Sequence, residues 1–90
     1  MYRLQRSEKL VRILKKLYKR DKRRYEATIS KIEEVMKSAE PGRYKHLSYE
    51  LKDFKRVHID SHFILTFKIY ENSKTISFMD LQHHDTAYRR

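Results

Sequence analysis

The chain has 90 residues, which is enough for one small domain and too few for two of ordinary size. Hydrophobic residues make up 39% of it and charged residues 38%; because the apolar residues are regularly spaced, this composition does not indicate disorder. Lys and Arg number 22 against 12 Asp and Glu, a formal net charge of +10, which favours nucleic acid as a partner. The alternative is an ordinary Lys-rich surface, as in proteins of thermophiles. In those proteins, however, Lys and Glu are enriched together, whereas here the basic residues outnumber the acidic ones.

The sequence also limits compartment and chemistry. It contains no Cys, which excludes disulfides and thiolate metal sites and fits a cytoplasmic protein. Residues 1–16 have no uninterrupted apolar run of the kind found in signal peptides. The longest apolar stretch, residues 63–67, is far shorter than a membrane span. We therefore expect no membrane segment.

The first half of the chain has the spacing of two helices. Residues 2–6 alternate like a short strand, and Ser7 is a candidate N-cap for a helix. Asp21 can cap a second helix, which we expect to end near Ser38, before Pro41-Gly42. The two helices have apolar stripes at helical spacing: Leu10, Ile13, Leu14 and Leu17 in the first, and Tyr25, Ile29, Ile32 and Met36 in the second.

The second half alternates with the period of strands. Segments 55–60, 63–70 and 75–79 predict an antiparallel meander, with a turn at residues 71–74. One predicted face is apolar and available to the helices; the other, carrying Arg56, His58, Thr66 and Lys68, is expected to be wet and basic. The sequence thus predicts a single α+β domain over residues 1–90, with an N-terminal strand and an αα-hairpin packed on a small, mainly antiparallel sheet.

Basic and aromatic residues alternate in the segment that precedes and opens the meander. Arg43, Tyr44, Lys45 and His46 form one run, followed by Lys52, Lys55, Arg56 and His58. Such interleaving suits phosphate contacts and base stacking. The alternative is a solvated loop and edge strand.

All five histidines lie in the second half: His46, His58, His62, His83 and His84. Histidine exchanges protons near neutral pH, and RNA cleavage by the 2′-hydroxyl needs a base, an acid and cations that hold the phosphate charge. Ordinary surface or core histidines and a zinc site remain alternatives; the positive charge and the absence of a helical His-x-x-x-His pair disfavour metal, and no metal or other cofactor is expected. In the polar tail, Tyr88 could stack on a base or pack onto the domain.

Taken in order, these segments resemble the RelE/ParE toxin superfamily over essentially the whole chain. The stretches that carry the resemblance are residues 43–47, 51–59, 63–69 and 83–88. Its YafQ-like mRNA interferases and their archaeal relatives are the most similar subgroup, with a histidine-based active site. The resemblance implies metal-independent cleavage of mRNA in the ribosomal A site, inhibition of translation, and an antitoxin that is acidic where it touches a monomeric toxin.

The resemblance also assigns residues. His84 matches the tail histidine four positions before the aromatic Tyr88, His58 the histidine of the strand, and His46 the histidine of the preceding loop. The subgroup's acidic residue after the strand histidine is replaced here by His62, with Asp60 nearby. We expect His84 to be the main acid/base group, assisted by His58 and His46. The expected RNA- or ribosome-binding residues are Arg43, Lys45, Lys52, Lys55, Arg56, His62, His83 and Tyr88.

One geometric condition and two rival functions remain. Strict alternation places His84 on the side of Ile76 and Phe78, opposite His58, so the last strand must end or bulge between about Asp80 and His84. The rivals are a ParE-like toxin that poisons a DNA topoisomerase, which does not require the histidines, and an RNA- or ribosome-binding module without catalysis.

Overall fold

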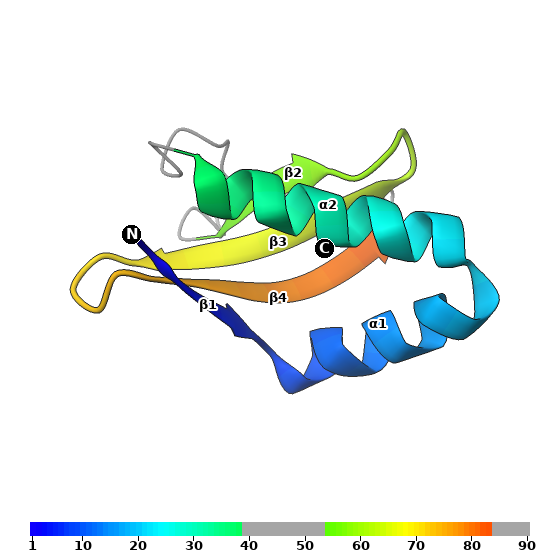
Figure 1. Cartoon of the computed structure of the whole chain (residues 1–90), viewed down its shortest axis with the longest axis horizontal. Helices are drawn as coiled ribbons and strands as arrows, with labels where there is room; N and C mark the ends of the chain where they lie inside the picture. Colours follow the sequence, from blue (N-terminus) through cyan, green and yellow to red (C-terminus); the bar gives the residue numbers. More distant parts are fainter. Residues whose placement is uncertain (39–53, 84–90) are drawn as a thin grey trace.

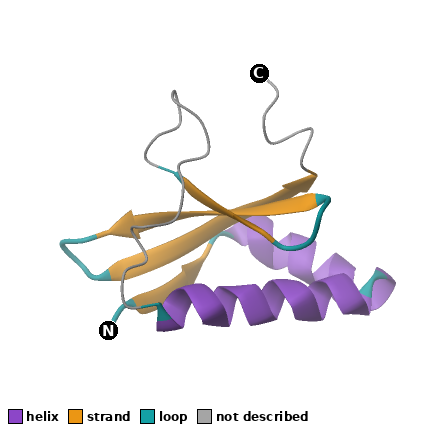
Figure 2. Cartoon of the chain, turned by 90° about the horizontal axis from the view of Figure 1, so that it is seen from above, coloured by secondary structure: helices purple, strands orange, loops and turns teal. Residues whose placement is uncertain are grey.

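The computed structural model describes residues 1–38 and 54–83 as two helices on one face of a sheet. The helices are α1 (Glu8–Arg20) and α2 (Lys22–Lys37), and the strands are β1 (Arg3–Arg6), β2 (Lys55–His58), β3 (Phe63–Tyr70) and β4 (Thr75–His83). The strand order is β1-β4-β3-β2, and both helices lie below the sheet in Figure 2. This confirms the predicted α+β fold.

Side-chain caps fix where the two helices begin, as predicted. Ser7 Oγ accepts a hydrogen bond from Leu10 N at 3.0 Å, and Asp21 Oδ1 accepts one from Arg24 N at 3.2 Å. Each cap satisfies an amide that has no partner within its helix. Because only Asp21 separates α1 from α2, the helices form a tight hairpin (Figure 1).

The sheet is mixed rather than a pure meander. Antiparallel pairing joins β2 to β3 and β3 to β4, as predicted, while β1 lies parallel to β4 with Leu4 beside Ile76. The strands differ from the predicted ranges at three ends: β1 starts at Arg3, β2 stops at His58, and β4 continues to His83. In the turn before β4, Lys74 has a φ of 51°.

A β-bulge in β4 reverses which side chains face the helices. Phe67 pairs with Phe78 and Thr66 pairs with Asp80, so Met79 is an extra residue between them. The sequence predicted that the last strand ends or bulges between about Asp80 and His84; within the described residues the strand continues to His83, and the bulge lies just before that range, at Met79. As a result Leu81 and His83 lie on the helix side of the sheet, whereas Asp80 and Gln82 lie on the other.

The core lies between the helices and the sheet. Phe67 and Phe78 are fully buried there with their ring centroids 5.4 Å apart. The other buried members of this cluster are Leu10, Leu14, Ile32, Val35, Leu65, Ile76 and Leu81. They come from both helical stripes and from alternate positions of β3 and β4, which is the pattern expected when helices cover one face of a sheet.

The opposite face, called here the open face, is not uniformly wet. Ile64 is 0% exposed and Thr66 is 5% exposed, although both point away from the helices. Phe54 packs on Ile64 as a small second apolar cluster. The prediction of a solvated face was therefore wrong at its centre, where an apolar patch is covered, and the polar residues are arranged around it. Neither helix of the described part of the chain is long and apolar enough to cross a membrane.

Candidate functional site

The open face brings together residues from three neighbouring strands. His58 pairs with Ile64, and Ile64 pairs with Gln82, so these three side chains form one row across β2, β3 and β4. Neighbouring strands are about 4.8 Å apart, which separates His58 from Gln82 by roughly 10 Å. His58 is exposed at the end of β2. Arg56, two residues earlier in the same strand, lies on the same face and pairs with Thr66.

A cleft of about 350 Å³ lies on this face, where the start of α1 meets β4. Its wall includes the bulge residue Met79 and both residues that the bulge turns outward, Asp80 and Gln82. The described residues that line it are Ser7, Lys9, Phe54, Thr66, Met79, Asp80 and Gln82. The bulge therefore creates the polar side of this cleft.

The electrostatics of the cleft depend on an ion pair across its edge. Lys9 Nζ lies 3.0 Å from Asp80 Oδ2, and the other carboxylate oxygen accepts a hydrogen bond from Leu81 N. The Asp80 side chain is 16% exposed and that of Lys9 is 60% exposed. Lys9 thus offsets the charge of Asp80, the one carboxylate among the described residues that line the cleft.

Aromatic rings flank the same face. Lys68 Nζ lies 5.7 Å from the centre of the Phe54 ring and 5.3 Å from that of Tyr70, within the range of cation–π attraction. Tyr70 is 42% exposed. A cation held between two rings, one of them accessible, is an arrangement that can contact a phosphate and a base together.

His62 and His83 lie near each other, His62 in the turn between β2 and β3 and His83 at the end of β4. The two rings are 6.1 Å apart, and His83 packs edge-on against Phe63 at 5.5 Å. His83 lies on the helix side of the sheet, in register with Phe63, and Arg24 of α2 stacks over the same Phe63 ring at 4.2 Å. The structure therefore separates these two histidines from His58 instead of gathering them into one cluster.

Asp60 has a structural role in the turn between β2 and β3. Its Oδ1 accepts hydrogen bonds from His62 N at 2.7 Å and Phe63 N at 3.2 Å, and its Oδ2 accepts one from Arg24 Nε at 3.3 Å. The His62 amide lowers the pKa of Asp60 most; burial opposes the shift, and Arg24 adds to it. These contacts hold the carboxylate ionised, so Asp60 is poorly suited to donate a proton near neutral pH.

The predicted site residues are thus only partly gathered. His58 and Arg56 share the open face, whereas Lys55 pairs with Phe67 and lies on the helix side at the edge strand. His62 and His83 lie together away from both. The remaining predicted residues lie outside the described part of the chain: His46, His84, Arg43, Lys45, Lys52 and Tyr88.

Sequence reasoning missed most of the cleft. In the sequence, Lys9 is one of many cations on an exposed helix face. Gln82 lines the cleft only because the bulge turns its side chain to the open face. One signal was present in the sequence: apolar residues recur at Ile76, Phe78 and then Leu81, and this three-residue step marks the change of parity. Within residues 1–38 and 54–83, no group of three His, Asp or Glu side chains is arranged to hold a metal ion.

The fold has known counterparts. The chain superposes on the crystal structure of YafQ from Escherichia coli with a TM-score of 0.66 and 16% identity, over 99% of this chain and all of that one. It also superposes on HP0892 of Helicobacter pylori with a TM-score of 0.61 and 24% identity, over 98% of this chain and all of the other. These likenesses define it as a small α+β protein with the YafQ fold.

Sequence relatives give the family. The "Putative toxin RelE4" of Methanocaldococcus jannaschii is 46% identical over 90 residues, all of this chain and 94% of the relative. An uncharacterised protein of Methanosarcina mazei is 39% identical over 88 residues, 98% of this chain and all of the relative. No family model matches the sequence. The full-length identity to the first relative shows that the chain belongs to the RelE toxin family.

Proposed function

We propose that the chain is the toxin of a type II toxin–antitoxin pair and cleaves mRNA in the ribosomal A site, which stops translation. The observation that carries this proposal is the position of His58. It stands exposed at the end of β2, on the open face that also carries Arg56 and the cleft beside β4. A proton-exchanging ring and a guanidinium on one face are two of the groups that cleavage by a 2′-hydroxyl needs.

The reaction divides into two proton transfers. A base removes the proton of the 2′-hydroxyl, whose oxygen attacks the adjacent phosphorus, and an acid protonates the departing 5′-oxygen, which leaves a 2′,3′-cyclic phosphate. His84 is assigned the main acid/base role, with His58 and His46 assisting. Arg56 and the predicted cations Arg43, Lys45 and Lys52 hold the phosphate charge, and Tyr88 stacks on a base or orients it.

The predicted residues that lie away from the open face are assigned a different role. Lys55, His62 and His83 lie on the helix side or at the turn of the β2–β3 edge. They are assigned contacts to the ribosome or to flanking RNA instead of contacts to the reacting phosphate.

The proposal includes a partner and a compartment. A toxin that acts on translating ribosomes works in the cytoplasm and needs a cognate antitoxin to keep it inactive. Because the toxin carries a net charge of +10, that antitoxin is expected to be acidic where it binds. The toxin alone is proposed to be a single-domain monomer that needs no cofactor.

The test is primer extension on a defined mRNA in a translating extract. Wild type, His58→Ala and His84→Ala are compared, with Lys37→Ala, an exposed position at the end of α2, as the control. Discrete cuts that require translation, persist in the control and disappear in His84→Ala are expected; His58→Ala should cut more slowly. Ribosome binding should survive both histidine substitutions.

Other outcomes would replace the proposal. Cuts that persist in His84→Ala would remove that residue from the mechanism. An uncut message accompanied by DNA breaks would support the topoisomerase-poisoning function, and salt-sensitive RNA binding without any product would support a binding module.

A further inference from the structure

The positive charge of this chain is concentrated in its first quarter. Residues 1–24 contain eleven Lys and Arg and two Asp and Glu, a net of +9. The other 66 residues, which include all the histidines proposed for catalysis, contribute only +1 of the total of +10. The charge that favours a nucleic-acid partner therefore comes almost entirely from β1, α1 and the start of α2.

Within that segment, α1 presents one continuous cationic face. Arg12, Lys15, Lys16, Lys19 and Arg20 recur at spacings of three and four residues, which places them on one side of a helix. All five are exposed. Among the described residues, no acidic side chain lies within salt-bridge distance of any of them. These charges are not used within the fold.

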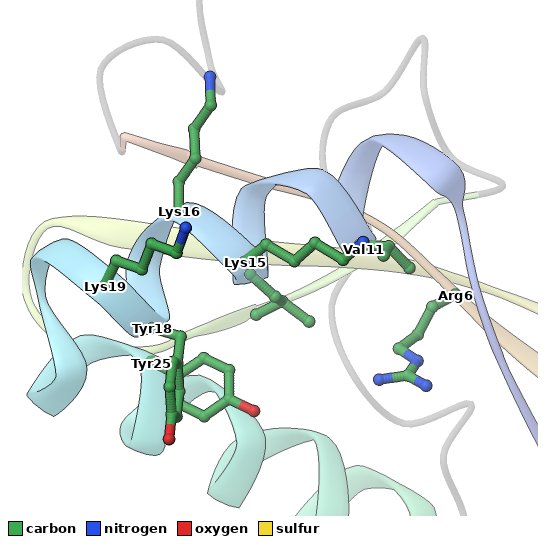
Figure 3. A pocket seen from close by; sticks show the side chains of 8 residues that line it. Arg6, Val11, Lys15, Lys16, Tyr18, Lys19 and Tyr25 are labelled. Atoms are coloured by element: carbon green, nitrogen blue, oxygen red, sulfur yellow. The ribbon is translucent and has the colours of Figure 1, made fainter.

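An aromatic hollow borders the cationic face (Figure 3). It has a volume of about 550 Å³ and lies where α1 meets α2, and Arg6 of β1 contributes to its lining. Tyr18 and Tyr25 meet edge-on inside it with ring centroids 5.1 Å apart, and Tyr18 is 53% exposed. Lys22 Nζ lies 4.9 Å above the Tyr18 ring.

The cationic face and the candidate site lie in different layers. The helices cover one face of the sheet, whereas His58, Arg56 and the cleft belong to the other (Figure 2). Only the first turn of α1, through Lys9, reaches the cleft. A partner bound along Lys15, Lys16 and Lys19 would therefore leave the open face accessible.

We propose that this cationic face of α1 binds the phosphate backbone of a folded RNA and so anchors the protein separately from its candidate site. The proposal rests on the proposed function, in which the folded RNA is that of the ribosome. The face positions the open side of the sheet toward the message while the helices hold the ribosomal RNA.

Two properties of the face favour folded RNA. Single-stranded RNA is usually held along a groove in which successive bases stack, whereas the side of a helix is convex and fits phosphates that border a groove of the RNA. An acidic protein helix needs aliphatic anchors. The hollow offers two, the half-buried Val11 and Leu14, which is only 5% exposed, and its rings are tyrosines flanked by cations.

The test compares two variants of the full chain that lose the same charge. Lys15→Gln, Lys16→Gln and Lys19→Gln are combined in one, and Lys31→Gln, Lys37→Gln and Lys74→Gln in the matched control; both are checked for folding by circular dichroism. Binding is measured across a range of salt with three probes: purified archaeal small ribosomal subunits, a short single-stranded RNA, and polyglutamate. Mapping message cleavage in the same samples tests the proposed function separately.

The expected result is a loss confined to the first variant and to the folded RNA. Its affinity for subunits should fall by about tenfold or more, and the slope of log affinity against log salt by about two; the control should stay close to wild type. Unchanged subunit binding, an equal loss in the control, or an equal loss for single-stranded RNA would overturn the proposal. Tighter binding to polyglutamate than to RNA would instead identify an acidic protein surface. Subunit binding without cleavage would contradict the nuclease alone.

Discussion

Lys9 Nζ lies 3.0 Å from Asp80 Oδ2 and joins the first turn of α1 to the residue that follows the bulge in β4. The pair crosses the edge between the two layers of the protein. It connects the cationic first quarter of the chain to the cleft on the open face, and it places one carboxylate next to the surface where a phosphate is proposed to bind.

Removing Lys9 should weaken RNA binding more than it weakens the fold. In Lys9→Gln, the cleft keeps the charge of Asp80 without its partner, which repels phosphate. Asp80→Asn should bind RNA at least as tightly as wild type, and the double variant should return close to wild type. Because Lys9 is 60% exposed, the pair contributes at most about 1 kcal/mol to stability. Filter binding and urea unfolding measure the two effects; equal RNA affinity in all four proteins would contradict this reading.

Ser7 should be more important for stability than its size suggests. Its Oγ accepts a hydrogen bond from Leu10 N and donates one to the carbonyl oxygen of the bulge residue Met79. Ser7→Ala removes both the cap of α1 and its tie to β4, at a cost of about 1–2 kcal/mol. Urea unfolding should show this loss, while Ser30→Ala, at an exposed site on α2, should show almost none. A loss as small as that of the control would mean that water replaces both bonds.

Local signals in the sequence predicted the elements. The caps at Ser7 and Asp21 and the alternation of apolar residues through Phe67 depend on residues close together in the chain. Helices, the antiparallel pairs and the core face therefore followed from pattern alone. The parallel pairing of β1 with β4 did not, because it joins residues such as Arg3 and Thr75 that are far apart in sequence.

The candidate site was less predictable because it depends on tertiary contacts. Lys9 belongs to the cleft only because α1 packs beside β4, and Asp80 faces the cleft only because Met79 is bulged. Histidines that look alike in sequence separate for the same reason: His58 faces the open side, and His83 pairs with Phe63 on the helix side. For these histidines, residue type alone does not tell which face of the sheet the side chain occupies.

The covered patch on the open face should behave as core. Ile64 is 0% exposed and packs against Phe54, so Ile64→Ala should cost about 2–5 kcal/mol through lost burial and the cavity that remains. Leu4→Ala is the matched control, because Leu4 is 49% exposed on the edge strand β1, and it should cost less than about 1 kcal/mol. Equal losses in urea unfolding would mean that Ile64 is solvated in solution, as the alternation of the sequence had predicted.

The charge of Asp60 should give the fold a defined sensitivity to acid. Its pKa is lowered in the folded protein, first by the hydrogen bond from the His62 amide and then by Arg24, while burial acts in the opposite direction. A carboxylate whose folded pKa lies below its unfolded value of about 3.9 stabilises the fold above that value, and the gain is lost as pH falls through the folded pKa. Because the side chain is 38% exposed, solvent screens this gain and keeps it small.

Asp60→Asn isolates this effect, because the amide oxygen can still accept the hydrogen bonds of the turn. Wild type should be more stable than Asp60→Asn above about pH 4, and the two unfolding free energies should converge below it. Arg24→Gln should be less stable throughout, since Arg24 also contacts Phe63 and Asp21. It should nevertheless keep part of the pH dependence that Asp60→Asn loses, because the His62 amide is the largest single cause of the shift and the Phe63 amide also lowers the pKa of Asp60. Urea unfolding between pH 2 and pH 7 distinguishes the two causes. If Arg24→Gln loses the pH dependence of the unfolding free energy as fully as Asp60→Asn does, the ion pair and not the turn lowers the pKa of Asp60.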